Sequence, residues 1–263
     1  MTLLLRRYGK TAAMAVAGFV GDSPMFLMDY LLRFLRVAVM LSIWRTILAG
    51  RGPVSGMTLS AVLTYTLIAE VFAEQLTCRT ELVWAFWDGS IATRFLKPMG
   101  VFAQFTAEML GRWAFGFCLF SLPLLLCASL LGVNPLPASG AAGLLFLASL
   151  ALGVSVGLTL EYISAGLAVG LEMYPYVLSQ ARAALATVLS GAFLPLALLP
   201  WGLGKVFGWL PFASMASAPL RIYTGTGDPL WLLAVQAGWS ALLWPVAAWL
   251  WRVNRERMVS YGG

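Results

Sequence analysis

The chain has 263 residues, of which 60% are hydrophobic and 11% are charged, and its formal net charge is +6. A soluble globular domain has roughly 25% charged residues, so this chain has too few charges to cover itself with a water-facing surface. Its surplus apolar side chains must therefore face lipid. The absence of histidine excludes Ser-His-Asp triads, Cys-His dyads and histidine-bearing metal sites. We expect no catalytic, cofactor-binding or metal-ligating residue, and the basic residues show none of the aromatic interleaving typical of nucleic-acid binding.

The first segment, residues 1–24, carries Arg6, Arg7 and Lys10 ahead of a short apolar run from Ala12 to Val20. A signal peptide needs a similar run together with a cleavage site. We favour an interfacial helix that lies on the cytosolic leaflet, because a basic amphipathic segment can bind there without spanning the bilayer.

Six apolar stretches approach the roughly 20 residues that a bilayer-spanning helix needs. The third is over-long, so we expect its start to be a cytosolic extension with Glu108 and Arg112, which are four residues apart and able to pair. Lys and Arg of the short loops collect on one side, and the positive-inside rule then places both termini in the cytoplasm. We expect an all-α membrane protein of about six transmembrane helices, with one domain over residues 1–263. The stretches are residues 28–48, 57–77, 102–131, 140–160, 183–200 and 229–251.

Four charges in the first two stretches need an explanation, because a charge at the bilayer centre costs on the order of 3 kcal/mol. The two helices are antiparallel, and Arg36 has the same depth as Glu70, while Arg33 has the same depth as Glu74. We therefore predict two ion pairs, and Asp29 is placed to share Arg33. The pairs fit either a substrate or proton path or a structural clamp. We favour the clamp, because the opposite signs compensate.

Residues 191–219 are apolar but repeatedly interrupted by Pro and Gly, and no piece after Pro200 is long enough to span. Non-helical backbone at membrane depth must be buried in protein or line a cavity. We interpret residues 201–228 as an outer re-entrant segment, with a plain interfacial loop as the alternative. The residues that define this interruption are Pro195, Pro200, Trp201, Trp209 and Pro211.

The loop between the second and third stretches, residues 79–100, has the pattern of two short helices around a turn. Asp88-Gly89 turns the chain, and a second amphipathic piece runs from Ile91 to Leu96 and ends at Pro98. An aromatic-rich helix in the cytosol needs a protein groove or the membrane surface. In the first helix we expect one face to be shared by Leu82, Val83, Phe86 and Trp87.

Taken in order, these features resemble the permease subunits of ATP-binding cassette exporters of the type-two class, in particular a branch with six spans and a separate ATPase. The matching residues include the loop from Asp88-Gly89 to Leu96-Lys97-Pro98, the Leu210-Pro211-Phe212 run and Tyr223-x-Gly225. The resemblance covers nearly the whole chain.

The resemblance implies a multi-pass protein of the bacterial inner membrane that pairs with itself or with a related permease. It also implies separate cytosolic ATPase subunits that bind ATP and Mg, a coupling helix in the 79–100 loop, and export of drug-like, lipid-like or other amphiphilic substrates. The residues it implies for the ATPase contact are Glu81, Trp84, Trp87, Asp88, Gly89, Arg94, Phe95 and Pro98.

The chain is not expected to be an enzyme. A P-loop needs G-x-x-x-x-G-K-[ST], and Gly9-Lys10-Thr11 has only the end of that pattern because Leu4 replaces its first glycine. A proton-coupled secondary transporter, with Glu70, Glu74 or Glu161 as carrier, is the alternative function. Such transporters usually show broken helices in both halves, and only one broken segment is found here. A membrane enzyme would need a clustered polar site, for which the chain has few candidates.

Overall fold

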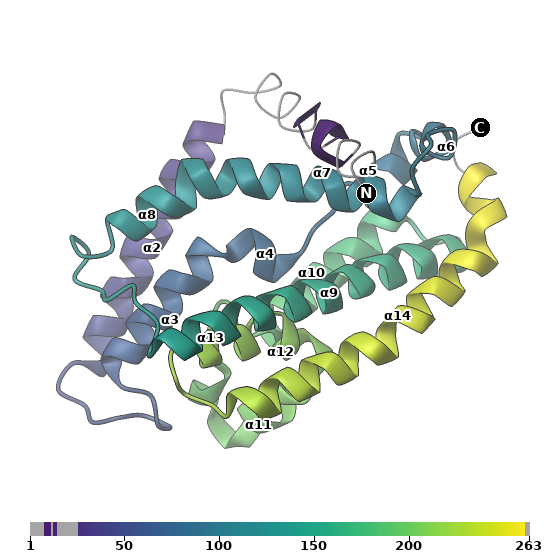
Figure 1. The fold of residues 1–263 in the computed structure, drawn as a ribbon. Helices are drawn as coiled ribbons and strands as arrows, with labels where there is room; N and C mark the ends of the chain where they lie inside the picture. The colour runs from purple at the N-terminus through teal and green to yellow at the C-terminus, as the bar shows by residue number, and fades with distance from the viewer. Residues whose placement is uncertain (1–7, 12, 15–25, 261–263) are drawn as a thin grey trace.

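The computed structural model describes residues 8–11, 13–14 and 26–260, and these residues form a bundle of helices (Figure 1). Over this described part the chain has no β-strand, only a single bridge between Val54 and Met57 in a loop. Residues 8–11 and 13–14 are helical. The rest of the expected interfacial segment, residues 1–24, lies outside the described residues.

Four helical runs make up the length of the bundle. Three of them are long and apolar enough to cross a membrane, namely Val101–Leu126, Gly140–Gly170 and Pro229–Arg257. The fourth, α2, has the length but contains Asp29, Arg33, Arg36 and Arg45, which lower its mean hydropathy. The runs are α2 (Phe26–Leu48), α7 (Val101–Gly116) continued through a π-helical turn η1 (Phe117–Ser121) into α8 (Leu122–Leu126), α9 (Gly140–Gly170) and α14 (Pro229–Ser260).

The predicted second span, residues 57–77, is two helices, α3 (Leu59–Val71) and α4 (Ala73–Thr77). The backbone leaves the helical region at Phe72. In an apolar environment a carbonyl freed by such a break needs another donor, and the Ser121 hydroxyl donates to the Val71 carbonyl at 2.6 Å. The π-helical turn η1 thus supports the break in its neighbour.

The predicted fifth span, residues 183–200, is wrong in position. The helix here is α10 (Pro175–Leu189), which begins eight residues earlier and ends eleven residues earlier than the predicted stretch. Its start has proline at the first helical position, where the missing N–H costs nothing. Its end is set by Gly191, which has a φ of +79°, a conformation that suits glycine.

Residues 190–228 form a chain of short helices that turns back into the bundle. Figure 1 shows α12 and α13 among the long helices and α11 at the edge. Residues 217–220 of α13 are all buried. A re-entrant segment requires such burial, because a broken backbone at membrane depth cannot face lipid. The elements are η2 (Leu196–Leu198), η3 (Pro200–Gly202), α11 (Leu203–Gly208), α12 (Pro211–Met215) and α13 (Ser217–Tyr223).

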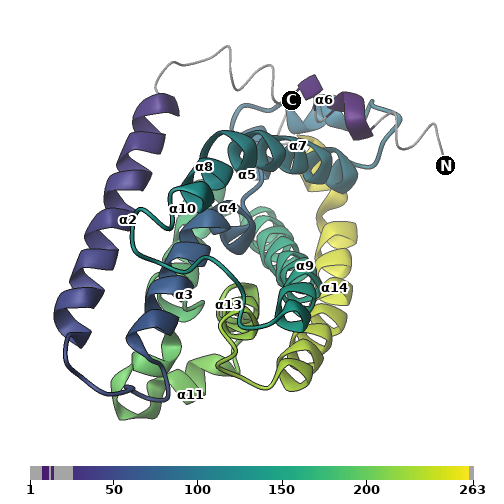
Figure 2. The ribbon, with the colours of Figure 1, turned by 60° about the vertical axis from the view of Figure 1, so that its left-hand side comes forward.

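Helix α9 is the centre of the bundle and lies along α14 (Figures 1 and 2). Its contacts with α14 are polar as well as apolar. The Ser149 hydroxyl donates to the Gln236 amide at 2.8 Å, and the Ser155 and Ser240 hydroxyls are 2.6 Å apart. Small and hydroxyl-bearing residues let apolar helices approach closely and bond across the interface, so this seam is of the kind found between membrane helices.

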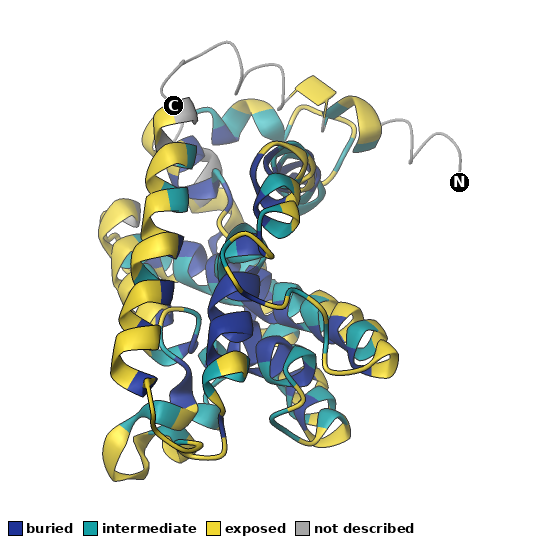
Figure 3. Cartoon of the chain, turned by 90° about the vertical axis from the view of Figure 1, so that its left-hand side faces the viewer, coloured by how far each residue is buried: buried dark blue, intermediate teal, exposed yellow. Residues whose placement is uncertain are grey.

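Figure 3 shows which residues of the bundle are exposed, and many of the exposed residues are large and apolar. Large exposed apolar residues lie on α2, α9 and α14, among them Leu31, Leu35, Leu144, Trp249 and Val253. Scattered exposed apolar residues are normal in soluble proteins, whereas extended apolar faces indicate contact with lipid or protein. The fold is therefore that of an all-α membrane protein, as the composition predicts.

Candidate functional site

The 79–100 loop folds as the sequence predicts, into two short helices around a turn. They are α5 (Leu82–Trp87) and α6 (Ile91–Arg94). Gly89 has a φ of +74°, and the Asp88 carboxylate accepts the Ser90 amide at 2.9 Å. This hydrogen bond from the Ser90 backbone lowers the pKa of Asp88 below its ordinary value, so the charge that closes the turn is retained at neutral pH.

One side of α5 is buried and the other presents tryptophans. Leu82, Val83 and Phe86 are buried, as predicted. Trp87 does not share their face, since it is 55% exposed and Trp84 is 54% exposed. Helix α5 ends at Trp87, so this ring is free to turn outward. The prediction that Trp87 packs with the buried face is therefore wrong, and the tryptophans make an outward surface instead.

Tyr174, just before α10, and Tyr176, in the first turn of α10, extend this tryptophan surface. The Trp87 ring meets the Tyr174 ring edge-on at a centroid distance of 4.5 Å, and Trp84 lies 6.2 Å from Tyr176. All four rings are exposed. Edge-to-face aromatic contacts hold rings in defined positions, so the sequence-distant turn at 171–174 fixes the outward surface of α5. Sequence reasoning missed this contribution.

Phe95, in contrast, points back into the bundle. Its ring stacks with Trp251 of α14 at 6.3 Å, and the Arg255 guanidinium lies 6.0 Å from the same ring. Pro98 is exposed and precedes α7. The loop is therefore attached to the end of α14 through Phe95, while its outward contacts come from Trp84 and Trp87.

Two ion pairs attach the loop to α7. Arg94 and Glu108 are 2.7 Å apart, and Glu81 and Arg112 are 3.0 Å apart. The predicted pairing of Glu108 with Arg112 is therefore wrong, because each finds a partner in the loop instead. A local i, i+4 pair on an exposed helix contributes only a few tenths of a kcal/mol, so nearby charges from another element displace it readily.

A buried ion pair lies at the base of the loop. Glu161 of α9 and Arg182 of α10 are 3% and 4% exposed, and their side chains form an ion pair. The Glu161 carboxylate also accepts the Thr80 backbone N–H at 3.3 Å and the Thr80 hydroxyl at 3.2 Å. One carboxylate thus connects α9 and α10 to the residue that leads into α5.

Close packing reinforces this base. Cys78 has a φ of +45° and lies against Gly157, where an added Cβ would be 2.6 Å from the Cys78 Cβ. Only glycine leaves room for this contact, because carbon atoms at that distance clash. The chain entering the loop is therefore fixed to the middle of α9 by both charge and shape.

The four charges of the first two predicted spans form the two pairs that their matched depths predict. Arg33 and Glu74 are 3.1 Å apart, and Arg36 pairs with Glu70. The Arg33 guanidinium also lies 5.5 Å from the Phe120 ring. Asp29 belongs to α2, but its side chain lies outside the described residues. The pairs bind α2 to α3 and α4. Their role as a structural clamp, in preference to a substrate or proton path, stays a prediction.

The residues predicted for the outer segment lie at its turns. Pro195 follows the break after α10, and Pro200 and Pro211 begin η3 and α12. Trp201 is 92% exposed, whereas the Trp209 carbonyl accepts the Trp239 indole N–H at 3.0 Å. Trp201 thus faces out at the end of the bundle opposite the 79–100 loop, where amphipathic rings are common at a membrane boundary.

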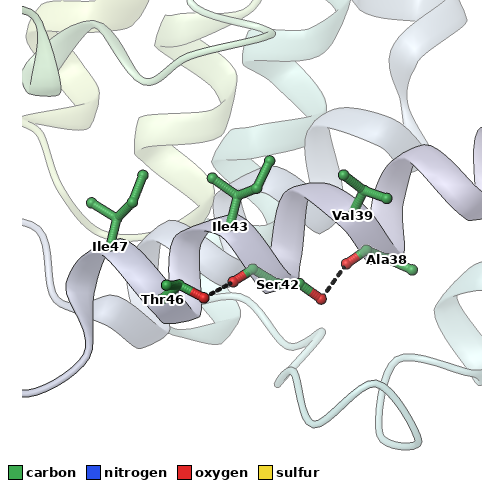
Figure 4. A pocket seen from close by; sticks show the side chains of 6 residues that line it. All are labelled: Ala38, Val39, Ser42, Ile43, Thr46 and Ile47. Atoms are coloured by element: carbon green, nitrogen blue, oxygen red, sulfur yellow. Dashed lines mark hydrogen bonds between the residues drawn. The ribbon is translucent and has the colours of Figure 1, made fainter.

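The outer face of α2 has a shallow groove of about 450 Å³ (Figure 4). Ala38, Ser42 and Thr46 repeat every four residues along it, and Val39, Ile43 and Ile47 run beside them. The Ser42 and Thr46 hydroxyls donate to carbonyls one turn earlier, at 2.8 and 3.0 Å. Their hydrogen-bonding needs are met within the helix, so the face is suited to close contact with another helix.

Taken together, the bundle and a helical loop attached to α7, α9, α10 and α14 define a multi-pass membrane protein. The family model described as ABC-2 family transporter protein matches residues 34–262. That match covers most of the chain, so the chain belongs to the ABC-2 transporter family, as the resemblance indicates. No curated protein and no solved structure shows significant similarity to it.

Proposed function

We propose that this chain is the membrane subunit of an ABC exporter that moves an amphiphilic substrate out of the cytoplasm. A separate ATPase supplies the energy. The chain lies in the bacterial inner membrane, and both of its termini lie in the cytoplasm. The observation that carries the proposal is the outward tryptophan surface of α5 in a member of the ABC-2 family. Family membership implies partnership with an ABC ATPase, and this surface is the best candidate for the contact.

In this mechanism ATP binding brings two ATPases together and moves α5. Thr80 connects α5 to Glu161, and Glu161 connects to Arg182. A push on the loop therefore reaches α9 and α10 at the same point. Stiff, hydrogen-bonded connections of this kind carry movement between sites when the elements have two arrangements. Alternating access would result as the helices rock.

We infer a second permease at the groove on α2. Its small residues, Ala38, Ser42 and Thr46, would allow close approach of a partner helix. The variant Ala38→Cys tests this, because the cysteines of two paired chains should cross-link in native membranes. The control variant Leu144→Cys, at an exposed position of α9, should cross-link much less.

The proton-coupled alternative receives no support from the site. Glu70, Glu74 and Glu161 are the carboxylates it would use, and each is paired with an arginine. Membership of the ABC-2 family favours a nucleotide-driven partner instead.

Capture of the ATPase tests the proposed contact. Affinity-tagged chain should recover an ABC ATPase from its native membranes, and Trp84→Ala with Trp87→Ala should reduce recovery about tenfold, because aromatic anchors dominate interface energies. The control is Trp201→Ala, which removes an even more exposed tryptophan ring at the opposite end of the bundle. Normal recovery by the double variant would show that α5 is not the contact.

A further inference from the structure

A second site lies beside α4 and does not include the buried Glu161 pair. It is a cavity of about 1040 Å³ with walls from α2, α4, α7 and the 79–100 loop. Ligand pockets are commonly about 300–1,000 Å³, so this space is large enough for a headgroup and part of a chain. Its basic lining residues are Arg33, Arg36, Arg79, Arg94, Lys97 and Arg112.

The cavity has a surplus of positive charge. Its acidic lining residues are Glu74, Glu81 and Glu108, so six basic groups face three acidic ones. Counting Glu70, which pairs with Arg36 from outside the lining, two positive charges still have no acidic partner among the residues described.

The surplus belongs to Arg79 and Lys97. Both side chains are exposed, and neither forms an ion pair within the described part of the chain. The four arginines that do have partners line the same cavity. Arg79 and Lys97 are therefore the two cations available to an incoming anion.

Part of the wall is apolar. Tyr30 of α2, Trp113 and Gly116 of α7, and Met14 line the same space. A ligand that fills it must offer an anionic group to Arg79 and Lys97 and an apolar part to the aromatic side chains. A small hydrophilic anion satisfies only the first requirement, whereas an anionic amphiphile satisfies both.

We propose that this cavity binds the phosphate headgroup of an anionic amphiphile, with Arg79 and Lys97 as its charge partners and Tyr30 and Trp113 against its chain. The site lies at the end of the bundle that carries the basic loop. Lys and Arg near a membrane surface attract anionic lipid headgroups. The binding does not require the ATPase, so it is testable even if the proposed export function fails.

Native mass spectrometry of the detergent-purified chain provides the test. Phosphatidylglycerol should bind more tightly than phosphatidylcholine of the same chain length. Arg79→Gln with Lys97→Gln should weaken phosphatidylglycerol binding roughly tenfold or more. The control variant, Arg51→Gln with Arg252→Gln, removes two exposed charges outside the cavity and should bind like the parent.

Three results would overturn the proposal. The first is equal affinity for the two lipids, and the second is equal weakening by the cavity and control variants. The third is binding of glycerol phosphate as tight as that of phosphatidylglycerol, which would indicate a site for a free anion. Because Arg79 and Lys97 make no ion pair in the described structure, the cavity variant should melt at the parent temperature without lipid. If the cavity variant melts at a lower temperature, Trp113→Ala replaces it in the test. Trp113→Ala should weaken the binding of phosphatidylglycerol and leave the binding of glycerol phosphate unchanged.

Discussion

The Glu161–Arg182 pair is the side-chain contact on which the proposed coupling most depends. Both residues are almost completely buried, and the Arg182 Nε and Nη1 groups have no hydrogen-bond partner among the described residues. Buried ion pairs add little net stability, but removing one partner leaves an uncompensated charge. Stability alone therefore does not explain why the pair is present. A fixed connection between Thr80, α9 and α10 does explain it.

Arg182→Met should destabilise the protein by about 3–5 kcal/mol, because Glu161 would remain buried without its counter-charge. The double variant Glu161→Gln with Arg182→Met should recover much of this loss, since it removes both charges. Arg252→Met, at an exposed arginine of α14, is the control. Thermal melting in detergent measures all three, and a melting temperature for Arg182→Met equal to that of the control would disprove the buried pair.

The depths of Glu161 and Arg182 contain a signal for their pairing. Glu161 lies nine residues before the end of α9 at Gly170, and Arg182 lies seven residues after α10 begins at Pro175. Matched depths in antiparallel helices predict pairing, as they do for Arg36 and Glu70. The sequence hides this match because the predicted fifth stretch, residues 183–200, begins after Arg182.

At the scale of elements, α2 is attached to the bundle by charge at one end. Its ion pairs reach α3 and α4 near the start of the helix, and its outer face stays apolar. Figure 2 shows α2 as one edge of the bundle. A helix attached in this way can serve both as a wall of the basic cavity and as the proposed contact for a second permease.

A double-mutant cycle on Arg36 and Glu70 measures this attachment. The Arg36 side chain is 51% exposed and that of Glu70 is 16% exposed, so we expect a modest coupling energy, on the order of 1 kcal/mol. Arg36→Gln alone should lower stability more than Arg36→Gln combined with Glu70→Gln, because the single change leaves a carboxylate near lipid. Steric-trapping measurements give the free energy of unfolding of each variant. If the losses of the two single variants add up to that of the double variant, the pair contributes nothing.

Apolar length predicts the long helices well and the broken ones poorly. The stretches at 102–131, 140–160 and 229–251 match α7–α8, α9 and α14 because each is a continuous apolar helix. The breaks at Phe72 and Gly191 depend on tertiary partners, Ser121 and the buried α13 respectively. Such partners are distant in sequence, so local patterns alone do not predict where the helix stops.

At the scale of the whole molecule, the loop, the buried pair and the cavity lie around one end of the bundle. The sequence predicts the loop, its turn and the ion pairs of α2, since periodicity and charge depth specify them. It does not predict that Trp87 turns outward or that Tyr174 and Tyr176 join the surface, because these contacts arise when α10 packs beside α5. The loop, the buried pair and the cavity therefore lie near the surface at which we propose that the ATPase binds.

In the proposed mechanism the chain moves its substrate only when a separate ATPase acts on it. The direct measurement is ATP turnover and lipid-analogue uptake in vesicles that contain the purified chain, the partner ATPase, or both. We predict ATP-dependent uptake with both proteins and none with either alone. Turnover of ATP by the chain alone, or uptake without the ATPase, would contradict this account.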